Sequence, residues 1–479
     1  MLRSVNQNLW VKNSPSGQAD SASPFTAYYQ LSEDRYLYFN GLSGAFDLVD
    51  AELHGCFTAL PARLGLIPPT FRDTLVERGH IVAPGDTTTM KRTLLAQVRA
   101  ELPLSELKFM ICPTDFCSMG CSHCFTYDHT QNAPRAVMDA TKIDRAFAYM
   151  FEMSRTTGKN LSNVILYGGE PFQPHTEPIV RHVLEKARLH GLPLASFSNG
   201  YFLETYRTLL TEYKDNIEIL AITLDGLAQL HDSKRKLKNA FDHAVAAIDM
   251  LIELGIQVQV KTNVNGQNIG EVPGLISFFK ERGWWGRKGM SFELNPIRYG
   301  NIKLARDTGT DIDLFLAVKK LSETDPDLLQ FDLLPLIDNK YHFLDALHLH
   351  DIKVSGIHFP TKVPKIYHCA SPSGNVHIFT ADGNIFLCNE EIGQSEAIFG
   401  RFDAMAEDFR LDEEKIEAYH DRTCDHIQAC SACPFLFLCA GGCPSNAKRC
   451  QGRDCGTLQK DFEALVGRYS NEILEEFGA

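Results

Sequence analysis

Long apolar runs are absent from this chain of 479 residues. No stretch approaches the roughly 18 consecutive apolar residues that a membrane-spanning helix needs, so we expect no membrane insertion. The opening segment, MLRSVNQNLWVKNSPSGQAD, lacks the apolar core of a signal peptide. An excess of positive charge is also missing, since 47 Lys and Arg against 60 Asp and Glu leave a net charge of −13. That balance argues against a general nucleic-acid binder. These absences predict a cytoplasmic protein.

Internal repeats and low-complexity segments are missing too, and the chain is too long for one ordinary core. We therefore expect two or three domains. Residues 1–24 are polar and rich in Ser, Asn and Pro, which predicts a loose tail. Residues 25–90 contain three strand-like runs and two helical stretches and predict a small α+β domain. Residues 91–105 are expected to link this domain to the next.

Strand-like and helical runs alternate from residue 106 to about 305. This alternation predicts a parallel sheet with right-handed crossovers, and hence an α/β fold with a partial (β/α)6, TIM-like barrel. Residues 306–365 form a bridging region, and residues 366–479 form a cysteine-rich domain with a C-terminal helix. The six expected strands span 107–112, 163–167, 193–198, 217–225, 256–264 and 290–296.

Cysteine is absent between Cys124 and Cys369, so most of the fourteen cysteines fall into two groups. The first group is Cys117-Ser-Met-Gly-Cys121-Ser-His-Cys124, directly after the first barrel strand. A 4Fe–4S cluster held by three cysteines keeps one iron open for a further ligand. The alternative is a zinc loop whose fourth ligand is Cys112, His123 or His129.

Short motifs follow the next three strands at their carboxyl ends, where barrel-like folds build active sites. They are Tyr167-Gly168-Gly169-Glu170-Pro171, Ser198-Asn199-Gly200 and Thr223-Leu224-Asp225-Gly226.

Together with the cysteine loop, these motifs resemble the radical S-adenosylmethionine (radical SAM) superfamily over about 106–300. The resemblance implies that S-adenosylmethionine and a 4Fe–4S cluster generate a 5′-deoxyadenosyl radical, which abstracts a hydrogen from the substrate. It implies that Cys117, Cys121 and Cys124 hold the cluster, and that Gly168, Gly169 and Glu170 receive the methionine ammonium. It also implies that His123 lies near the adenine and that Ser198 and Asn199 face the ribose or the methionine carboxylate. Thr223 and Arg235 are further candidates for binding that carboxylate. The usual residue at position 223 is Ser, and Thr keeps the hydroxyl.

The second cysteine group resembles the SPASM extension of radical SAM enzymes that modify peptides and proteins. The resemblance implies two auxiliary 4Fe–4S clusters, three in all. Cys430, Cys433, Cys439 and Cys455 would hold the distal one, and Cys369, Cys388 and Cys443 the one nearer the active site. The fourth ligand of the nearer cluster stays open between Cys424, Cys450 and no protein ligand. The alternative is a pair of zinc sites.

The domain at 25–90 resembles the winged-helix peptide-recognition element of such maturases, which binds a precursor's leader by adding a strand to its sheet. The alternative is a structural cap on the barrel. Related sulfatase-maturing enzymes carry an Asp directly after the cysteine equivalent to Cys388, and this Asp acts as a catalytic base. This chain has Asn389 there, which weakens the sulfatase interpretation but leaves Glu390 or Glu391 as a substitute base, of which we name Glu390. The alternative for both glutamates is a solvated surface pair.

The leading hypothesis is therefore an oxidoreductase-type maturase that crosslinks a ribosomally synthesised peptide through a C–S or C–C bond. Its expected partners are a precursor peptide with a leader and a low-potential flavodoxin or ferredoxin. The alternatives are an enzyme that oxidises Cys or Ser in a protein such as a sulfatase, and a non-catalytic zinc-binding scaffold.

Overall fold

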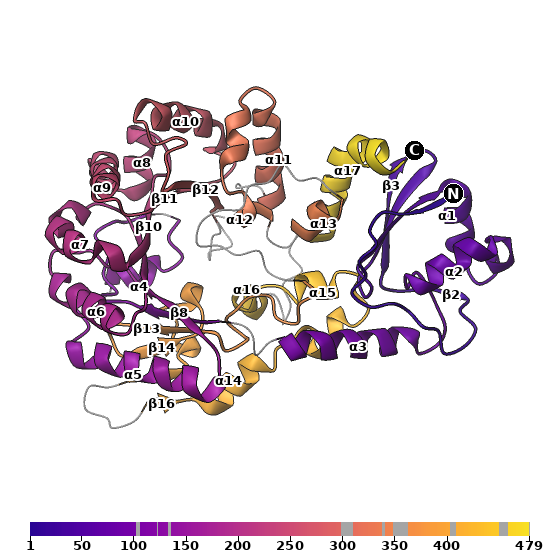
Figure 1. Cartoon of the computed structure of the whole chain (residues 1–479), viewed down its shortest axis with the longest axis horizontal. Helices are drawn as coiled ribbons and strands as arrows, with labels where there is room; N and C mark the ends of the chain where they lie inside the picture. Colours follow the sequence, from indigo (N-terminus) through magenta and orange to yellow (C-terminus); the bar gives the residue numbers. More distant parts are fainter. Residues whose placement is uncertain are drawn as a thin grey trace.

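The computed structural model describes residues 1–101, 106–121, 123–132, 136–297, 310–337, 341–347, 363–402, 409–449 and 458–478. Figure 1 shows the barrel and a small N-terminal sheet at opposite ends of the longest axis. The cysteine-rich region and the helix α3 (Asp86–Glu101) lie between them. This helix covers most of the expected linker.

The N-terminal sheet is antiparallel and has the order β1-β5-β4-β3. Its strands are β1 (Leu2–Ser4), β3 (Thr26–Ser32), β4 (Arg35–Asn40) and β5 (Ala45–Asp50). One face packs against α1 (Ala51–Phe57) and α2 (Pro69–Glu77).

The expectation of a loose tail over 1–24 is wrong for two segments of that range. Strand β1 pairs with β5, and β2 (Ser21–Ala22) pairs with β6 (Ile81–Val82). The Met1 ammonium also contacts the Asp50 carboxylate. Backbone pairing orders these polar residues, and a side-chain pattern gives no sign of it.

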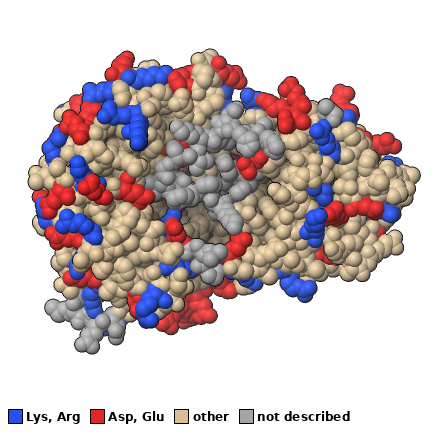
Figure 2. Space-filling view, viewed as in Figure 1, with Lys and Arg blue, Asp and Glu red and all other residues tan. Residues whose placement is uncertain are grey.

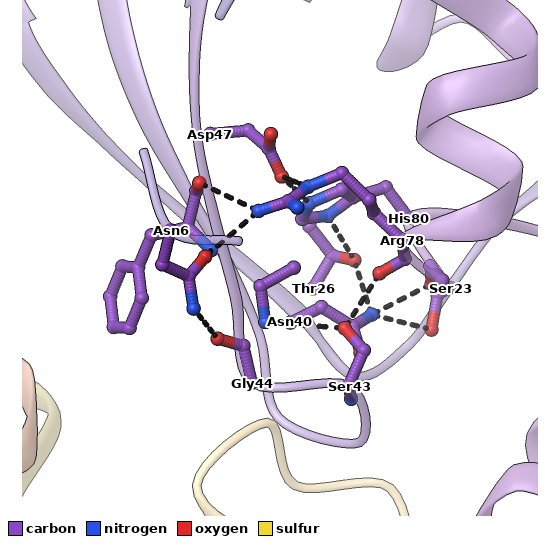
Figure 3. A network of polar contacts seen from close by, with 12 residues as sticks. Asn6, Ser23, Thr26, Asn40, Ser43, Gly44, Asp47, Arg78 and His80 are labelled. Atoms are coloured by element: carbon purple, nitrogen blue, oxygen red, sulfur yellow. Dashed lines mark hydrogen bonds and ion pairs between the residues drawn. The ribbon is translucent and has the colours of Figure 1, made fainter. Parts of the chain in front are cut away.

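A buried polar network ties the segment after α2 to this sheet (Figure 3). The fully buried Asp47 carboxylate accepts from Arg78 Nε at 2.6 Å and contacts His80 Nε2 at 2.8 Å. Burial alone would raise the pKa of Asp47, but the bonds to His80 and Arg78 lower it. Asn40 donates to the Gly79 carbonyl at 2.7 Å. The network therefore fixes residues 78–80 against β4 and β5.

The other face of the sheet shares an apolar core with the C-terminal part of the chain. The ring of Phe39 lies 6.1 Å from that of Phe435 and 6.4 Å from that of Phe462, which belongs to α17 (Leu458–Phe477). A side chain at Gly41 would place its Cβ 1.7 Å from the Pro434 carbonyl oxygen. The regions 25–90 and 366–479, which we expected to be separate domains, therefore pack as one body at this interface.

The six predicted barrel strands are confirmed, and they are parallel and adjacent in chain order. They are β7 (Leu107–Ile111), β8 (Leu161–Leu166), β9 (Leu194–Ser198), β10 (Ile217–Thr223), β11 (Val258–Val264) and β12 (Met290–Pro296). The helices between them include α4 (Tyr127–Asn132), α5 (Ala140–Thr157), α6 (Glu177–Leu189), α7 (Arg207–Tyr213), α8 (Ala228–Arg235), α9 (Ala240–Leu254) and α10 (Val272–Glu281).

The sheet does not end at β7. Strand β13 (Val376–Phe379) pairs with β7 in parallel, and β14 (Asn384–Phe386), β15 (Gly400–Arg401) and β16 (Arg410–Leu411) continue it antiparallel to ten strands. The start of the cysteine-rich region is thus hydrogen-bonded to the barrel, and Asn389, directly after Cys388, contacts Tyr167 at the end of β8.

The remaining helices lie after the barrel. They are α11 (Asp311–Ser322), α12 (Leu334–Ile337), α13 (Tyr341–Ala346), α14 (Glu413–His420), α15 (Leu436–Cys439) and α16 (Pro444–Arg449). None of the helices in the described ranges is long and apolar enough to cross a membrane. On the face shown in Figure 2, Lys and Arg side chains are interspersed with Asp and Glu.

Candidate active site

A cavity of about 490 Å³ lies at the carboxyl ends of the barrel strands. Its walls come from the loop after β7, from the ends of β8 to β12, and from the segment after Cys388. Twelve residues predicted from the sequence line it: Cys117, Cys121, His123, Cys124, Gly168, Gly169, Glu170, Ser198, Asn199, Thr223, Arg235 and Glu390. Folding therefore brings the predicted barrel residues and Glu390 to one place.

The three cysteines of the first group face this cavity with polar partners behind them. Cys121 Sγ accepts from Arg235 Nη1 at 3.5 Å, and Asn199 Nδ2 lies 3.9 Å from Cys117 Sγ. Burial raises the pKa of Cys117 to about 12 and also raises that of Cys121. The thiols therefore need nearby positive charge to ionise, and the buried Arg235 and a bound iron cluster both supply it.

The donor set fits a three-cysteine cluster better than zinc, because the expected fourth zinc ligands face other groups. His123 Nε2 lies 3.6 Å from Asp225, and His129 Nε2 lies 3.9 Å from Asp115. Cys112 is fully buried among apolar side chains. Within the described residues, no three Cys, His, Asp or Glu side chains are grouped to hold a single metal ion.

The Gly168-Gly169 pair lets the β8 loop lie directly on the backbone that enters the cysteine loop. Gly168 has a φ of +112°, and a Cβ there would lie 2.6 Å from the Thr114 carbonyl oxygen. A Cβ on Gly169 would lie 2.3 Å from the Phe116 carbonyl oxygen. Gly169 N also donates to Thr114 O at 3.2 Å. The glycines thus have a packing role, and their contact with the methionine ammonium stays a prediction.

Glu170 is buried and bonded to the neighbouring loop. Its carboxylate accepts from Ser198 Oγ at 2.8 Å, from Asn199 N at 2.7 Å and from Phe172 N at 3.1 Å. Burial raises its pKa to about 7, against the effect of these donors. The carboxylate therefore joins the β8 loop to the β9 loop, and its contact with the methionine ammonium stays a prediction.

Asp225 is the central acidic residue of the site, although sequence reasoning gave it no role. Its Oδ2 lies 2.7 Å from Arg235 Nη2 and 3.6 Å from His123, and its Oδ1 accepts from Asn263 Nδ2 at 2.9 Å. Burial would raise the pKa of Asp225, but the Arg235 guanidinium brings it down to about 2. Burial lowers the pKa of His123 to about 4, so this ring is neutral at pH 7. Cys121, Arg235, Asp225 and His123 thus form one connected chain.

Three further lining residues, Tyr167, Lys261 and Asn389, received no role from the sequence. Asn389 Nδ2 donates to the Tyr167 hydroxyl at 3.1 Å, which joins the segment after Cys388 to the end of β8. Lys261 on β11 also lines the cavity. Their positions at strand ends, or next to a predicted ligand cysteine, could have indicated that they belong to the site. Their contacts could not be predicted, because these depend on the folded sheet.

The cysteines predicted for the nearer auxiliary cluster accept hydrogen bonds from their own following backbone. The N–H groups of Ser371, Glu390 and Asn446 donate to the thiols of Cys369, Cys388 and Cys443. Bonds of this kind are typical around iron–sulfur clusters.

The remaining cysteines of this region fall into three groups. Cys424 is fully buried in an apolar cluster that includes Cys430, and its S–H points at the Lys365 carbonyl, 3.9 Å away. Cys433 and Cys439 are half-buried and form no disulfide within the described part of the chain. Cys450 and Cys455 lie outside the described residues.

Comparison with known proteins agrees with this geometry. Residues 111–279 match the Radical SAM superfamily. Residues 111–279 form a radical SAM domain. Proteins of this superfamily use S-adenosylmethionine and a 4Fe–4S cluster, which agrees with three cysteines facing the cavity.

Curated relatives resemble this chain over part of their length. The Fe-coproporphyrin III synthase of Methanosarcina barkeri (strain Fusaro / DSM 804) is 26% identical over 175 residues, which are 34% of this chain and 39% of that protein. The AdoMet-dependent heme synthase of the same organism is 27% identical over 197 residues, or 39% and 53% of the two chains. The chain thus spans about half the length of these relatives or less.

A solved structure shows the fold. The chain resembles native anSMEcpe with bound AdoMet and Kp18Cys peptide, with a TM-score of 0.53 and 14% identity over 78% of this chain and 99% of that one.

Proposed function

We propose that this radical SAM enzyme crosslinks residues of a ribosomally synthesised peptide through a C–S or C–C bond. The observation that carries the proposal is one cavity with two walls, one from the radical SAM strands and one from the segment after Cys388. The exposed edge of β3 in the N-terminal sheet would hold a second part of the same peptide, which suits a long flexible substrate.

The cavity residues would hold the cofactors. Cys117, Cys121 and Cys124 would bind a 4Fe–4S cluster, which with S-adenosylmethionine supplies a 5′-deoxyadenosyl radical for hydrogen abstraction. The neutral His123 would lie against the adenine, and Arg235, held by Asp225, would face the carboxylate. Thr223, at the end of β10, is a further candidate for that carboxylate.

Two auxiliary clusters complete the proposed cofactor set. Cys430, Cys433, Cys439 and Cys455 would hold the distal cluster, and Cys369, Cys388 and Cys443 the nearer one. Three clusters predict about 12 irons per chain after full anaerobic reconstitution. Iron and acid-labile sulfide assays check this, and about four irons per chain would contradict the auxiliary clusters. Reduction would require a low-potential flavodoxin or ferredoxin as partner.

The outer edge of β3 is the proposed leader-binding strand. Gly41 N donates to Phe25 O, so the backbone groups of Ala27 and Tyr29 face β4 in this antiparallel register. The backbone groups of Tyr28 and Gln30 therefore face outward. β3 is the last strand of this sheet on that side, and both side chains are exposed. An extended peptide can pair with such an edge.

Substitution at this edge tests the leader site without touching the core. Gln30→Pro removes an outward N–H and leaves the β3–β4 ladder intact, whereas the matched control Gln30→Ala keeps the N–H. We expect the proline variant alone to weaken binding of the precursor's leader about tenfold, measured by fluorescence anisotropy. Equal affinities for the two variants would show that the sheet is only a cap.

The proposed catalytic base is Glu390, which lines the cavity beside Asn389. Asn389 cannot take up a proton, and it is bonded to Tyr167 instead, so the chain lacks the base of the sulfatase-maturing enzymes at that position. Glu390→Gln should slow product formation while S-adenosylmethionine is still cleaved.

Co-expression with a short peptide encoded beside the gene tests the function as a whole. Mass spectrometry should find a product that has lost two hydrogen atoms, with fragments missing across the crosslink. Consumption of Fe-coproporphyrin III, with every candidate peptide left unchanged, would instead assign the chain to the chemistry of its curated relatives.

A further inference from the structure

Lys261 is a partly buried cation that lines the cavity. It lies on β11, its side chain is 15% exposed, and its Nζ lies 3.1 Å from a Glu293 carboxylate oxygen. The ammonium also lies 5.0 Å from the centre of the Phe197 ring, which is another cavity residue. Both contacts hold the ammonium at the edge of the cavity.

Glu293 is a fixed partner for this lysine. It is fully buried on β12, it accepts from Gln259 Nε2 at 3.0 Å, and the Asn295 amide also donates to it. A carboxylate with these donors orients the lysine and does not itself face the cavity. A lysine ammonium has three donor hydrogens, and one carboxylate oxygen uses one of them.

The place of Lys261 separates it from the proposed cofactor residues. Arg235 is engaged by Asp225 and Cys121, and Asn263 bonds to the same Asp225. Lys261 lies two residues before Asn263 on the same face of β11, about 7 Å deeper in the barrel. The other N–H groups of the Lys261 ammonium can thus reach a part of the cavity that lies deeper in the barrel than Asp225 and its partners.

We propose that Lys261 binds a carboxylate of the substrate and so selects acidic substrates. The cavity supports this choice, because Asn295, whose amide also donates to Glu293, is a further lining residue with a donor group. This inference rests on the proposed function, in which the carboxylate belongs to an Asp or Glu side chain of the precursor peptide. A propionate of a porphyrin offers the same group, and the experiment distinguishes the two sources.

Equilibrium binding to the anaerobic holoenzyme with S-adenosylmethionine tests the proposal. The probes are N-acetyl-glutamate N-methylamide, its uncharged glutamine counterpart, and Fe-coproporphyrin III. We expect the wild type to prefer the glutamate probe over the glutamine probe about tenfold. Lys261→Arg should keep this preference, and Lys261→Met combined with Glu293→Gln should abolish it. The double substitution avoids an unpaired buried carboxylate.

The matched control is Lys108→Met, which removes a partly buried lysine from a cavity at the amino ends of the same strands and should keep the preference. The proposal would be overturned if the wild type showed neither a glutamate preference nor lysine-dependent binding of Fe-coproporphyrin III, or if the glutamate preference survived in the double variant. So would loss of S-adenosylmethionine binding in the double variant, since Lys261 would then belong to the cofactor site. Lysine-dependent binding of Fe-coproporphyrin III without any glutamate preference would keep the carboxylate site and reject the peptide.

Discussion

Glu170 is a carboxylate whose proton equilibrium changes when the chain folds. Burial raises its pKa from 4.5 to about 7, so between these values the folded protein keeps a proton that the unfolded chain has lost. The protonation therefore favours the folded state most below pH 4.5, and this advantage disappears as the pH rises through 7.

We expect the free energy of unfolding of the holoenzyme to fall by about 3 kcal/mol between pH 4.5 and 8 because of this one group. Glu170→Gln has no proton to lose, so its unfolding free energy should lack that slope. Denaturant unfolding under argon at several pH values measures both proteins. Parallel pH profiles for wild type and variant would show that the carboxylate is ionised throughout, held so by Ser198 and Asn199.

Asp225 shows what the sequence reveals about single residues and what it does not. Its position after β10 marked a βα loop of the active site, and the motif containing it was found. Its partners lie at positions 123, 235 and 263. Only the folded sheet brings these positions together, so the residue's role could not be read from spacing.

At the level of elements, the glycines of the β8 loop give the clearest test. Gly169→Ala would place a methyl group 2.3 Å from the Phe116 carbonyl oxygen and push the cysteine loop away. We expect this variant to lose the barrel cluster, about four irons per chain, together with S-adenosylmethionine cleavage. Gly270→Ala is the control, because nothing lies within 4 Å of a Cβ at that position. Iron assays that give equal values for both variants would contradict the close approach.

The barrel strands were predictable from sequence because each is an apolar run between helical segments of suitable length. The pairing of β13 with β7 was not, because residues 376–379 are separated from residues 108–111 by the whole barrel. The tertiary fold determines which strand a short strand pairs with, and the local pattern of apolar residues does not predict it. Strand β1 was missed for the same reason.

At the level of the whole molecule, the two ends of the chain stabilise each other. Phe462 is fully buried against Phe39 and Phe435. We expect Phe462→Ala to lower the free energy of unfolding by about 3–5 kcal/mol. Hydrogen exchange in β3 to β5 should increase as well.

The control for this prediction is Leu189→Ala, at an end of α6 where the side chain is 74% exposed. It should change stability by less than about 0.5 kcal/mol. Loss of stability in Phe462→Ala without faster exchange in the N-terminal sheet would mean that the two ends unfold independently.

The shared core also sets an order of events during synthesis. The N-terminal sheet leaves the ribosome first, but the aromatic face that contains Phe39 has no cover until residues 458–477 have been made. The sheet that carries the strand edge at Tyr28 and Gln30 can therefore pack completely only after the cysteines of both groups have been translated. On the proposed function, a nascent chain would meet its precursor peptide only when all the cysteines proposed as cluster ligands have been made.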